Sequence, residues 1–296
     1  GRGAPPPLRV SPAQVAPVMF VLLWSTGFIV ARYGTRDAGP LTFLFLRLVI
    51  AAAVLSVWAR ATDAPRLTRE HIVWAAVAGF FLHGVYLGGV FIASSWNLPS
   101  GLAALIAGLH PVITSVAALV LLGEGLTRRQ WIGVGLGVGG VAAVVVDRLD
   151  AGVSGVTAGA LIAMAVSVLG MSAGTLVQRA KGGAMPLLRG TAVQYASAAV
   201  ALGVGSIAYE GFDVEMTTRF WLSLTWAVVV LSIAAVLIML WLLQRQVAAR
   251  VSSLFFLTPA LSTVEGAVLF GERLGVLAVV GLAVALSGVY LTTRSP

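Results

Sequence analysis

The chain has 296 residues, of which 59% are hydrophobic and only 10% are charged, and its mean hydropathy is +0.98. A water-soluble domain of this size needs far more polar residues to cover its surface, so the composition excludes a soluble globular fold and indicates a protein embedded in lipid. The net charge of +8 raises nucleic-acid binding as an alternative. The basic residues stand singly at the ends of apolar runs, however, so we expect no nucleic-acid partner. The absence of cysteine excludes disulfides and cysteine-ligated metals.

Ten apolar segments are long enough to cross a membrane as helices, which need roughly 17 to 25 mostly apolar residues each. The short stretches between them carry the charged residues and turn formers. The sequence therefore predicts an all-α integral membrane protein with ten transmembrane helices, preceded by a disordered tail over residues 1–13. The predicted spans are 14–31, 41–59, 71–93, 99–122, 131–146, 156–177, 186–209, 220–243, 251–270 and 274–292.

The distribution of Lys and Arg predicts the orientation of these spans. With the N-terminus inside, thirteen basic residues fall in inner segments and five in outer segments, and Arg47 lies within the membrane. Because inner loops of membrane proteins are enriched in Lys and Arg, we expect both termini in the cytoplasm of a cell whose inner (plasma) membrane holds the protein. Membrane lipid is then an obligatory partner, whereas no sequence feature indicates an obligate protein partner.

The second half of the chain repeats the first. A Leu-x-Pro motif is followed in both halves by Gly-Glu-x-Leu and a glycine-spaced helix, at an offset of 148 residues from Pro111 to Pro259. Earlier in each half the offset is 147, from Arg47 to Gln194. Each predicted half, 14–148 and 149–293, holds five spans, and this odd number requires the second half to be inverted. Inverted repeats place a binding site near the midplane and supply two nearly equivalent states for alternating access.

This duplicated pattern resembles the drug/metabolite transporter superfamily of the EamA type. Arg47 within Leu-Arg-Leu and the pair Trp24-Ser25 match the family pattern as well. The resemblance covers nearly the whole chain and implies a secondary-active carrier, not an enzyme, that exports small amphipathic metabolites, with aromatic or apolar amino acids favoured. Gln194 stands where the repeat places the equivalent of Arg47. We therefore expect an asymmetric site.

Two ionisable residues lie deep in predicted spans. Burying the Arg47 guanidinium costs a few kcal/mol or more, so it must face the bundle interior. It either binds a substrate carboxylate or packs helices through backbone carbonyls. Glu265 is the only acidic residue deep in a span. It either carries a proton for coupled transport or is a neutral side chain bonded to a neighbouring helix.

A set of aromatic and amide side chains completes the predicted substrate site. His83 and Tyr86 share one face of the third span and can stack on a ligand or hydrogen-bond to it, although a lone histidine in a span is as often a satisfied interhelical contact. Trp24 lies at mid-span, where it can form a cavity wall. The predicted substrate-binding residues are Trp24, Arg47, His83, Tyr86, Gln194, Trp241 and Gln244.

Two further motifs are structural in our interpretation. Pro111 and Pro259 each lack one helical amide, so we expect them to bend the fourth and ninth spans and to act as hinges. The stretch from Gly135 to Gly140 matches G-x-G-x-x-G, but it lies inside an apolar span and not after a strand. We therefore interpret its glycines as contacts for close helix packing and not as a nucleotide site.

Two other functional classes are weaker alternatives. An intramembrane enzyme acting on a lipid-like substrate needs clustered aspartates or a serine, histidine and carboxylate within reach, and a passive channel needs rings of charge or a continuous polar stripe. The ionisable residues within spans form neither set. We predict no catalytic residue, no metal site and no cofactor.

Overall fold

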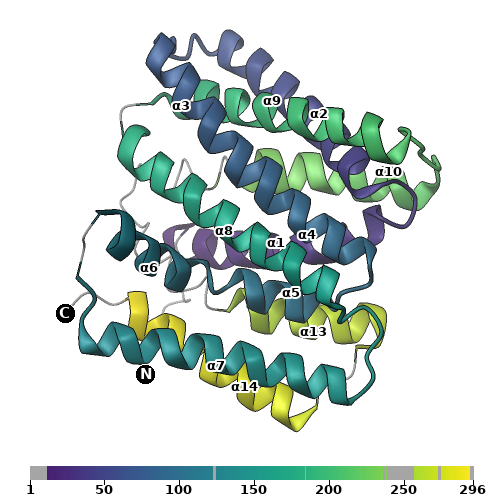
Figure 1. The fold of residues 1–296 in the computed structure, drawn as a ribbon. Coiled ribbons are helices and arrows are strands. Elements are labelled where there is room, and N and C mark those ends of the chain that lie inside the picture. Colours follow the sequence, from purple (N-terminus) through teal and green to yellow (C-terminus); the bar gives the residue numbers. More distant parts are fainter. Residues whose placement is uncertain are drawn as a thin grey trace, which may run out of the picture.

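In a computed structural model of the protein, the described residues are 12–122, 125–183, 185–235, 238, 257–272 and 275–293. They form helices joined by short turns, and none of them forms a strand beyond an isolated bridge between Ala38 and Val214 (Figure 1). Trp241 and Gln244 lie outside the described residues.

The helices follow one another in the order that the spans predict. The first half contains α1 (Pro12–Gly34), α2 (Pro40–Ala61), α3 (Arg69–Gly79), the π-helical η1 (Phe80–Val85), α4 (Tyr86–Ser95), α5 (Ser100–Ala107), α6 (His110–Leu122) and α7 (Arg128–Asp150). The second half contains α8 (Ala158–Lys181), α9 (Leu187–Gly205), η2 (Ser206–Glu210), α10 (Thr218–Thr225), η3 (Trp226–Ala234), α13 (Thr258–Phe270) and α14 (Val276–Thr293).

Within the described residues, six helical runs have the length and apolar character needed to cross a membrane, and three more are apolar but shorter. The shorter runs are Val18–Gly34, Thr218–Ala234 and Val276–Thr292, and α13 lies in the ninth predicted span. Together these elements match the ten predicted spans, so the all-helical, multi-span fold is confirmed. Threonines mark several helix starts: Thr68, Thr127, Thr157 and Thr217 each accept a backbone N–H of the helix that follows.

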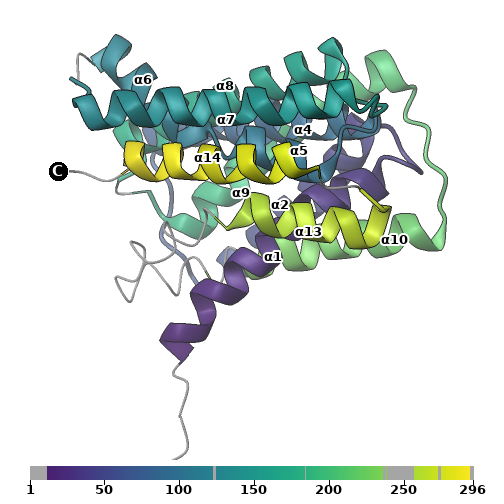
Figure 2. The same cartoon turned by 90° about the horizontal axis from the view of Figure 1, so that it is seen from below.

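The last helix of each half packs against its counterpart in antiparallel fashion. Gly133 of α7 meets Gly288 of α14, and Gly140 meets Gly281, with carbonyl oxygens less than 3 Å from where a Cβ would stand. Under the 148-residue offset these two contacts are images of each other. That reciprocity is the mark of a two-fold axis between the halves. Figures 1 and 2 show α7 and α14 side by side from two directions.

The second helix of each half repeats this arrangement. At one end of the α2 and α9 pair, the hydroxyls of Thr42 and Ser206 are 2.6 Å apart. At the other end, Arg189 donates through Nε to Ala64 O at 2.9 Å and through a terminal nitrogen to Ala59 O at 3.4 Å. The contact between 59 and 189 is the image of that between 42 and 206 under the 147-residue offset. The halves are therefore inverted relative to each other, as predicted.

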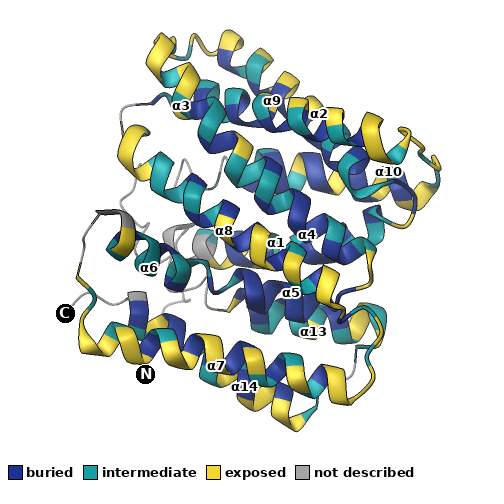
Figure 3. Ribbon diagram, viewed as in Figure 1, coloured by how far each residue is buried: buried dark blue, intermediate teal, exposed yellow. Residues whose placement is uncertain are grey.

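Burial is greatest in the short helices of the bundle interior. All eight residues of α5 are buried, and its neighbour α4 is largely buried too. Apolar residues such as Val57, Ile162 and Val200 are exposed on α2, α8 and α9. Figure 3 shows exposed and buried residues along the same helices. In a membrane these exposed residues face lipid, which explains why the sequence shows little amphipathic periodicity.

The glycine contacts generate the first prediction. In Gly140→Ala, the new Cβ would overlap the backbone nitrogen of Ala285, so α7 and α14 must separate. We expect a loss of about 1 to 3 kcal/mol in stability, measured as a lower Tm in detergent. Gly139→Ala is the matched control, because nothing lies within 4 Å of its Cβ. Equal effects of the two substitutions would contradict the packing role.

Candidate functional site

Two π-helical segments lie at related positions of the two halves. η1 lies in the third span and η3 in the eighth, and the 148-residue offset carries residues 80–85 of η1 onto 228–233, within η3. A π-helical turn replaces the i→i+4 bond with i→i+5, which costs stability and occurs frequently at functional sites. η1 carries His83, and η3 carries Ser232.

Arg47 extends from α2 to the second of these segments. Its Nε donates to Ser232 Oγ at 3.1 Å, and the residue is only 7% exposed. Arg47 thus shares a neighbour with Tyr195, whose hydroxyl donates to Ser232 O at 3.4 Å. Its two terminal nitrogens form no hydrogen bond or ion pair with any other residue that the structure describes. Among these residues, Arg47 is thus a buried cation whose terminal N–H groups have no acceptor and which has no carboxylate beside it.

Gln194, the repeat equivalent of Arg47, makes the matching contact on the other side of the axis. Its Oε1 is 3.4 Å from His83 Nε2, and its Nε2 donates to Gln178 Oε1 at 2.8 Å. The His83 ring packs edge-on against Tyr195 at 4.7 Å. Arg47 therefore contacts η3 while Gln194 contacts η1, so that the site has two-fold geometry but asymmetric chemistry.

The arrangement can recognise an anion beside an aromatic surface. The guanidinium supplies charged donors, the amide and imidazole supply neutral polar groups, and the rings of His83, Tyr86 and Tyr195 supply apolar faces. None of these groups is a carboxylate, so no like charge among them opposes the binding of an anion. Among the described residues, no group of three or more metal-ligating side chains occurs.

Three predicted residues lie elsewhere in the described part of the chain. Trp24 packs on Phe20 at 5.6 Å in a separate apolar cluster, so the structure does not bring it together with Arg47. Pro111 is the second residue of α6, two residues after the break that follows α5. Pro259 is the second residue of α13 and borders Gly108 in that break. Whether the prolines act as hinges stays a prediction.

Glu265 joins α13 to α1. Its Oε1 lies 2.6 Å from Ser25 Oγ, which is also 2.9 Å from Leu22 O. Its Oε2 is buried and has no partner among the described residues. Ser262 Oγ donates to Ser25 O at 3.1 Å, which adds a second contact between α13 and α1. The Glu265 carboxyl group therefore lies between the two halves, and no described cation pairs with it.

Three residues of the site were not predicted from the sequence: Tyr195, Ser232 and Gln178. Tyr195 follows Gln194 directly, so the repeat register could have drawn attention to it. Ser232 lies in the eighth span, and its residue type alone does not single it out. Gln178 had no signal beyond its polarity near the end of a span. The π-helical turns that orient His83 and Ser232 leave no pattern in the sequence.

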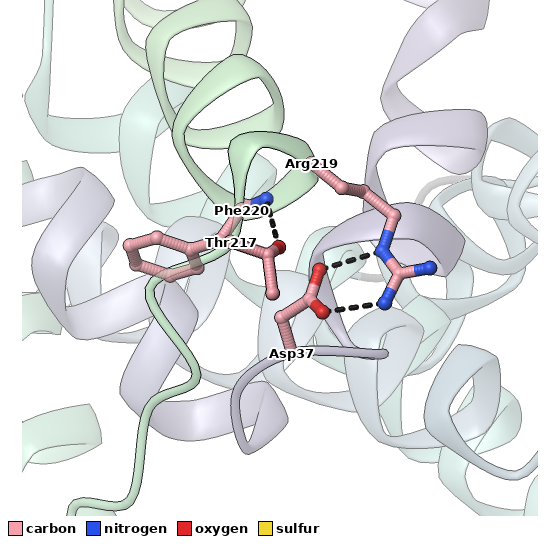
Figure 4. Close-up of polar contacts among 4 residues, drawn as sticks. All are labelled: Asp37, Thr217, Arg219 and Phe220. Carbon is pink, nitrogen blue, oxygen red and sulfur yellow. Dashed lines mark hydrogen bonds and ion pairs between the residues drawn. The ribbon is translucent and has the colours of Figure 1, made fainter.

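Carboxylates from both halves gather at one end of the bundle, which we call the acidic end: Asp37, Glu210 and Glu272. Asp37, between α1 and α2, accepts two bonds from Arg219 of α10, one of them from Nε at 2.6 Å (Figure 4). These bonds hold the pKa of Asp37 below its usual value. Glu210 accepts the N–H groups of Leu41 and Thr42 at 2.9 and 2.8 Å, which caps α2.

Glu272 forms the second ion pair at this end, with Arg32. Both ion pairs that occur among the described residues thus lie at the acidic end and connect one half with the other. At the opposite end, the described contacts between α2 and α9 use backbone carbonyls instead.

Comparison with known proteins identifies the family. The model of the EamA-like transporter family matches residues 14–146 and again 158–294, which together cover most of the chain. The chain belongs to the EamA-like transporter family. A solved crystal structure shares this fold, with a TM-score of 0.66 and 22% identity over 95% of this chain and 96% of the other.

Curated relatives in this EamA-like family include named exporters. A probable amino-acid metabolite efflux pump of Escherichia coli is 24% identical over 94% of this chain and 93% of its own length. A probable terminal-alkyne amino-acid exporter of Streptantibioticus cattleyicolor is 26% identical, but the match covers only 47% of this chain and 46% of that protein. The uncharacterized inner membrane transporter YedA of E. coli is 28% identical over 40% of this chain and 39% of its own.

Proposed function

We propose that this EamA-like protein exports amino acids with apolar or aromatic side chains across the bacterial inner membrane as a secondary-active carrier. The observation that carries this proposal is Arg47: a buried guanidinium near the two-fold axis, whose terminal nitrogens have no hydrogen-bond partner or counter-ion among the described residues. A buried cation costs several kcal/mol unless it is paired, so a ligand carboxylate at this position would recover part of that cost. The relatives named as amino-acid exporters support the same substrate class.

The groups around Arg47 favour an apolar side chain on the ligand. The His83 ring packs on Tyr195, whose hydroxyl donates to Ser232, the residue that Arg47 contacts, and Gln194 supplies an amide that can engage an ammonium group or its water. A mostly apolar wall with a few fixed polar groups gives a small ligand both affinity and orientation. Trp24 would serve as a more distant wall, since it packs in a separate cluster.

Alternating access is the mechanism we propose for these inverted halves. Residues 14–148 and 149–293 would act as the two repeat units, and Pro111 and Pro259 would let the fourth and ninth spans bend at related places. Each conformation would then be approximately the other with the halves exchanged. The charge bias of the loops supports cytoplasmic termini, which puts the acidic end outside the cell.

The test of the substrate assignment uses Arg47→Gln. The variant loses a charge-assisted bond of about 1.5 to 3 kcal/mol, so apparent affinity should fall roughly 10- to 150-fold for phenylalanine, tryptophan, methionine and threonine alike. Saturable uptake and counterflow in liposomes containing the pure protein measure this loss and separate a carrier from a channel.

Two controls sharpen this assay. Phenylalaninamide lacks the carboxylate, so its transport should change little between wild type and Arg47→Gln. Gln194→Glu would place an anion at the repeat-equivalent position, where it should weaken carboxylate binding without removing the Arg47 side chain. If a sugar or nucleoside is carried while no amino acid is, the substrate assignment is wrong and the family assignment stands.

Glu265 is our candidate for the proton-coupling group. The Ser25 hydroxyl has one proton and two acceptors within reach, Leu22 O and Glu265 Oε1. A protonated Glu265 could donate to Ser25 Oγ, which would satisfy both contacts. Loss of that proton would leave an uncompensated charge between α1 and α13, and this would couple proton release to a movement of the halves.

Substitution of Glu265 tests proton coupling. We expect Glu265→Gln to abolish the pH dependence of uphill transport and to spare equilibrium exchange. The glutamine amide has nearly the shape of the carboxyl group, but it does not bind and release a proton in this pH range. Uphill transport and counterflow, each measured at several pH values on both sides of neutrality, give the answer. The matched control is Glu210→Gln, which removes a carboxylate from the acidic end. An unaltered pH profile in Glu265→Gln would leave Glu265 with a structural role only.

The orientation is tested with reporter fusions. Reporters after Arg294 and beside Arg66 should read as cytoplasmic, and a reporter beside Asp213 should read as external, because the basic residues concentrate on the inner side. A cytoplasmic signal at Asp213 would reverse the assignment of the acidic end.

A further inference from the structure

The end of α1 is held by the end of α13. Arg32 forms an ion pair with Glu272, and their side chains are only 16% and 7% exposed. The Arg32 guanidinium also lies 4.4 Å from the centre of the Phe270 ring. A cation over a ring and beside a carboxylate is bound from two directions, so α1 of the first half is fastened here to α13 of the second.

The same carboxylate binds a third helix. Glu272 Oε1 accepts the backbone N–H of Ser100, the first residue of α5, at 2.9 Å. This amide belongs to the unsatisfied group at a helix start, where the helix dipole favours a negative charge. One oxygen of Glu272 therefore connects α1, α5 and α13, the helices whose ends meet at this point of the acidic end.

Two glycines allow Glu272 to take this position. Gly271 has φ +67, a left-handed conformation that turns the chain back after α13. The returning carboxylate lies over Gly266, where a Cβ would stand 2.6 Å from Glu272 Oε2. A side chain at position 266 would therefore push the carboxylate away from Arg32.

The repeat register gives each of these residues a counterpart in the first or second half of the sequence. Gly271-Glu272 corresponds to Gly123-Glu124, which lie outside the described residues, and Arg32 corresponds to Arg179. Arg179 is exposed, and it forms no ion pair with a described residue. The repeat-equivalent cations thus differ in environment: Arg32 is held between the halves, whereas Arg179 faces outward.

We infer that Glu272 is a lock that keeps the acidic end closed in this conformation, and that its separation from Arg32 and Ser100 N opens this end. The inference rests on the proposed alternating access, because only a carrier of that kind needs an end that opens. The lock requires all three parts: an acid at 272, a cation at 32 and an unobstructed Gly266. Removing one charge leaves the other partly buried and unpaired, which favours the opened end.

Ser100→Cys provides the reporter. The chain has no cysteine, so labelling has no background, and Ser100 is only 2% exposed beneath Glu272. Its hydroxyl forms no hydrogen bond with a described residue, so the exchange of oxygen for sulfur removes no such bond. In the locked state a membrane-impermeant maleimide should reach the introduced thiol slowly, and in the opened state it should reach the thiol rapidly.

The experiment compares labelling rates in sealed vesicles of known orientation. In the Ser100→Cys background, Glu272→Gln and Arg32→Gln should each speed labelling at least about tenfold, because each breaks a pair that is largely shielded from water. The double variant should be no faster than the faster single variant, since both act on one interaction. Arg36→Gln is the matched control, because Arg36 lies over the Tyr33 and Phe270 rings without an ion pair among the described residues. It should change the rate less than about twofold.

Gly266→Ala tests the lock without changing a charge. Its Cβ should displace the Glu272 carboxylate, so the introduced thiol should again be labelled faster. Monodisperse elution in detergent establishes that each variant is folded. Labelling of folded Glu272→Gln at the rate of the Ser100→Cys parent overturns the lock, whatever is transported. Faster labelling in a protein that transports no amino acid supports the lock and contradicts the substrate assignment. Faster labelling that occurs only from the cytoplasmic side contradicts the predicted orientation and nothing else.

Discussion

Close antiparallel backbone contact between repeat-equivalent helices is the constraint on which this architecture depends. In a bilayer the hydrophobic effect does not drive helices together, so association relies on van der Waals contact and hydrogen bonds. Gly133, Gly140, Gly281 and Gly288 bring the backbones of α7 and α14 into direct contact, and α2 and α9 form the matching pair on the other side of the bundle. Both pairs lie across the same two-fold axis, which relates the third span to the eighth.

The two-fold axis explains both the location of the candidate site and its asymmetry. Equivalent positions in inverted halves approach each other only near the axis, so Arg47 and Gln194 meet the π-helical segments η3 and η1 by the same geometry. A symmetric pair of arginines there would bring two like charges into a low-dielectric interior. The glutamine avoids that repulsion and leaves the site with one charged side and one neutral side. A zwitterionic ligand would bind such a site in a single orientation.

Carboxylates at the acidic end are paired with positive groups, whereas the carboxyl group in the interior is not paired with a described cation. Asp37, Glu210 and Glu272 each pair with a guanidinium or the start of a helix in the opposite half. These partners compensate the negative charge of the carboxylates in a region where water is partly excluded, so the contacts can join the two halves. The region still lies near water, so the separated charges could be hydrated when the contacts break. Glu265, deeper in the bundle, has only the Ser25 hydroxyl beside it among the described residues.

The sequence by itself determined the membrane-embedded helical fold, the ten spans and the inverted repeat, because span length, composition and an odd number of spans per half leave little freedom once lipid is the solvent. It also singled out Arg47, His83 and Gln194, since polar residues inside a span must have a reason to be there. Only the tertiary structure decided which partners they have. The π-helical turns that aim His83 and Ser232 depend on backbone hydrogen bonds that residue type does not specify, and Tyr195 gains its role from the ring it contacts. The contact of Glu272 with Arg32 and Ser100 joins residues that are far apart in the sequence, and it exists only because Gly271 turns the chain back over Gly266.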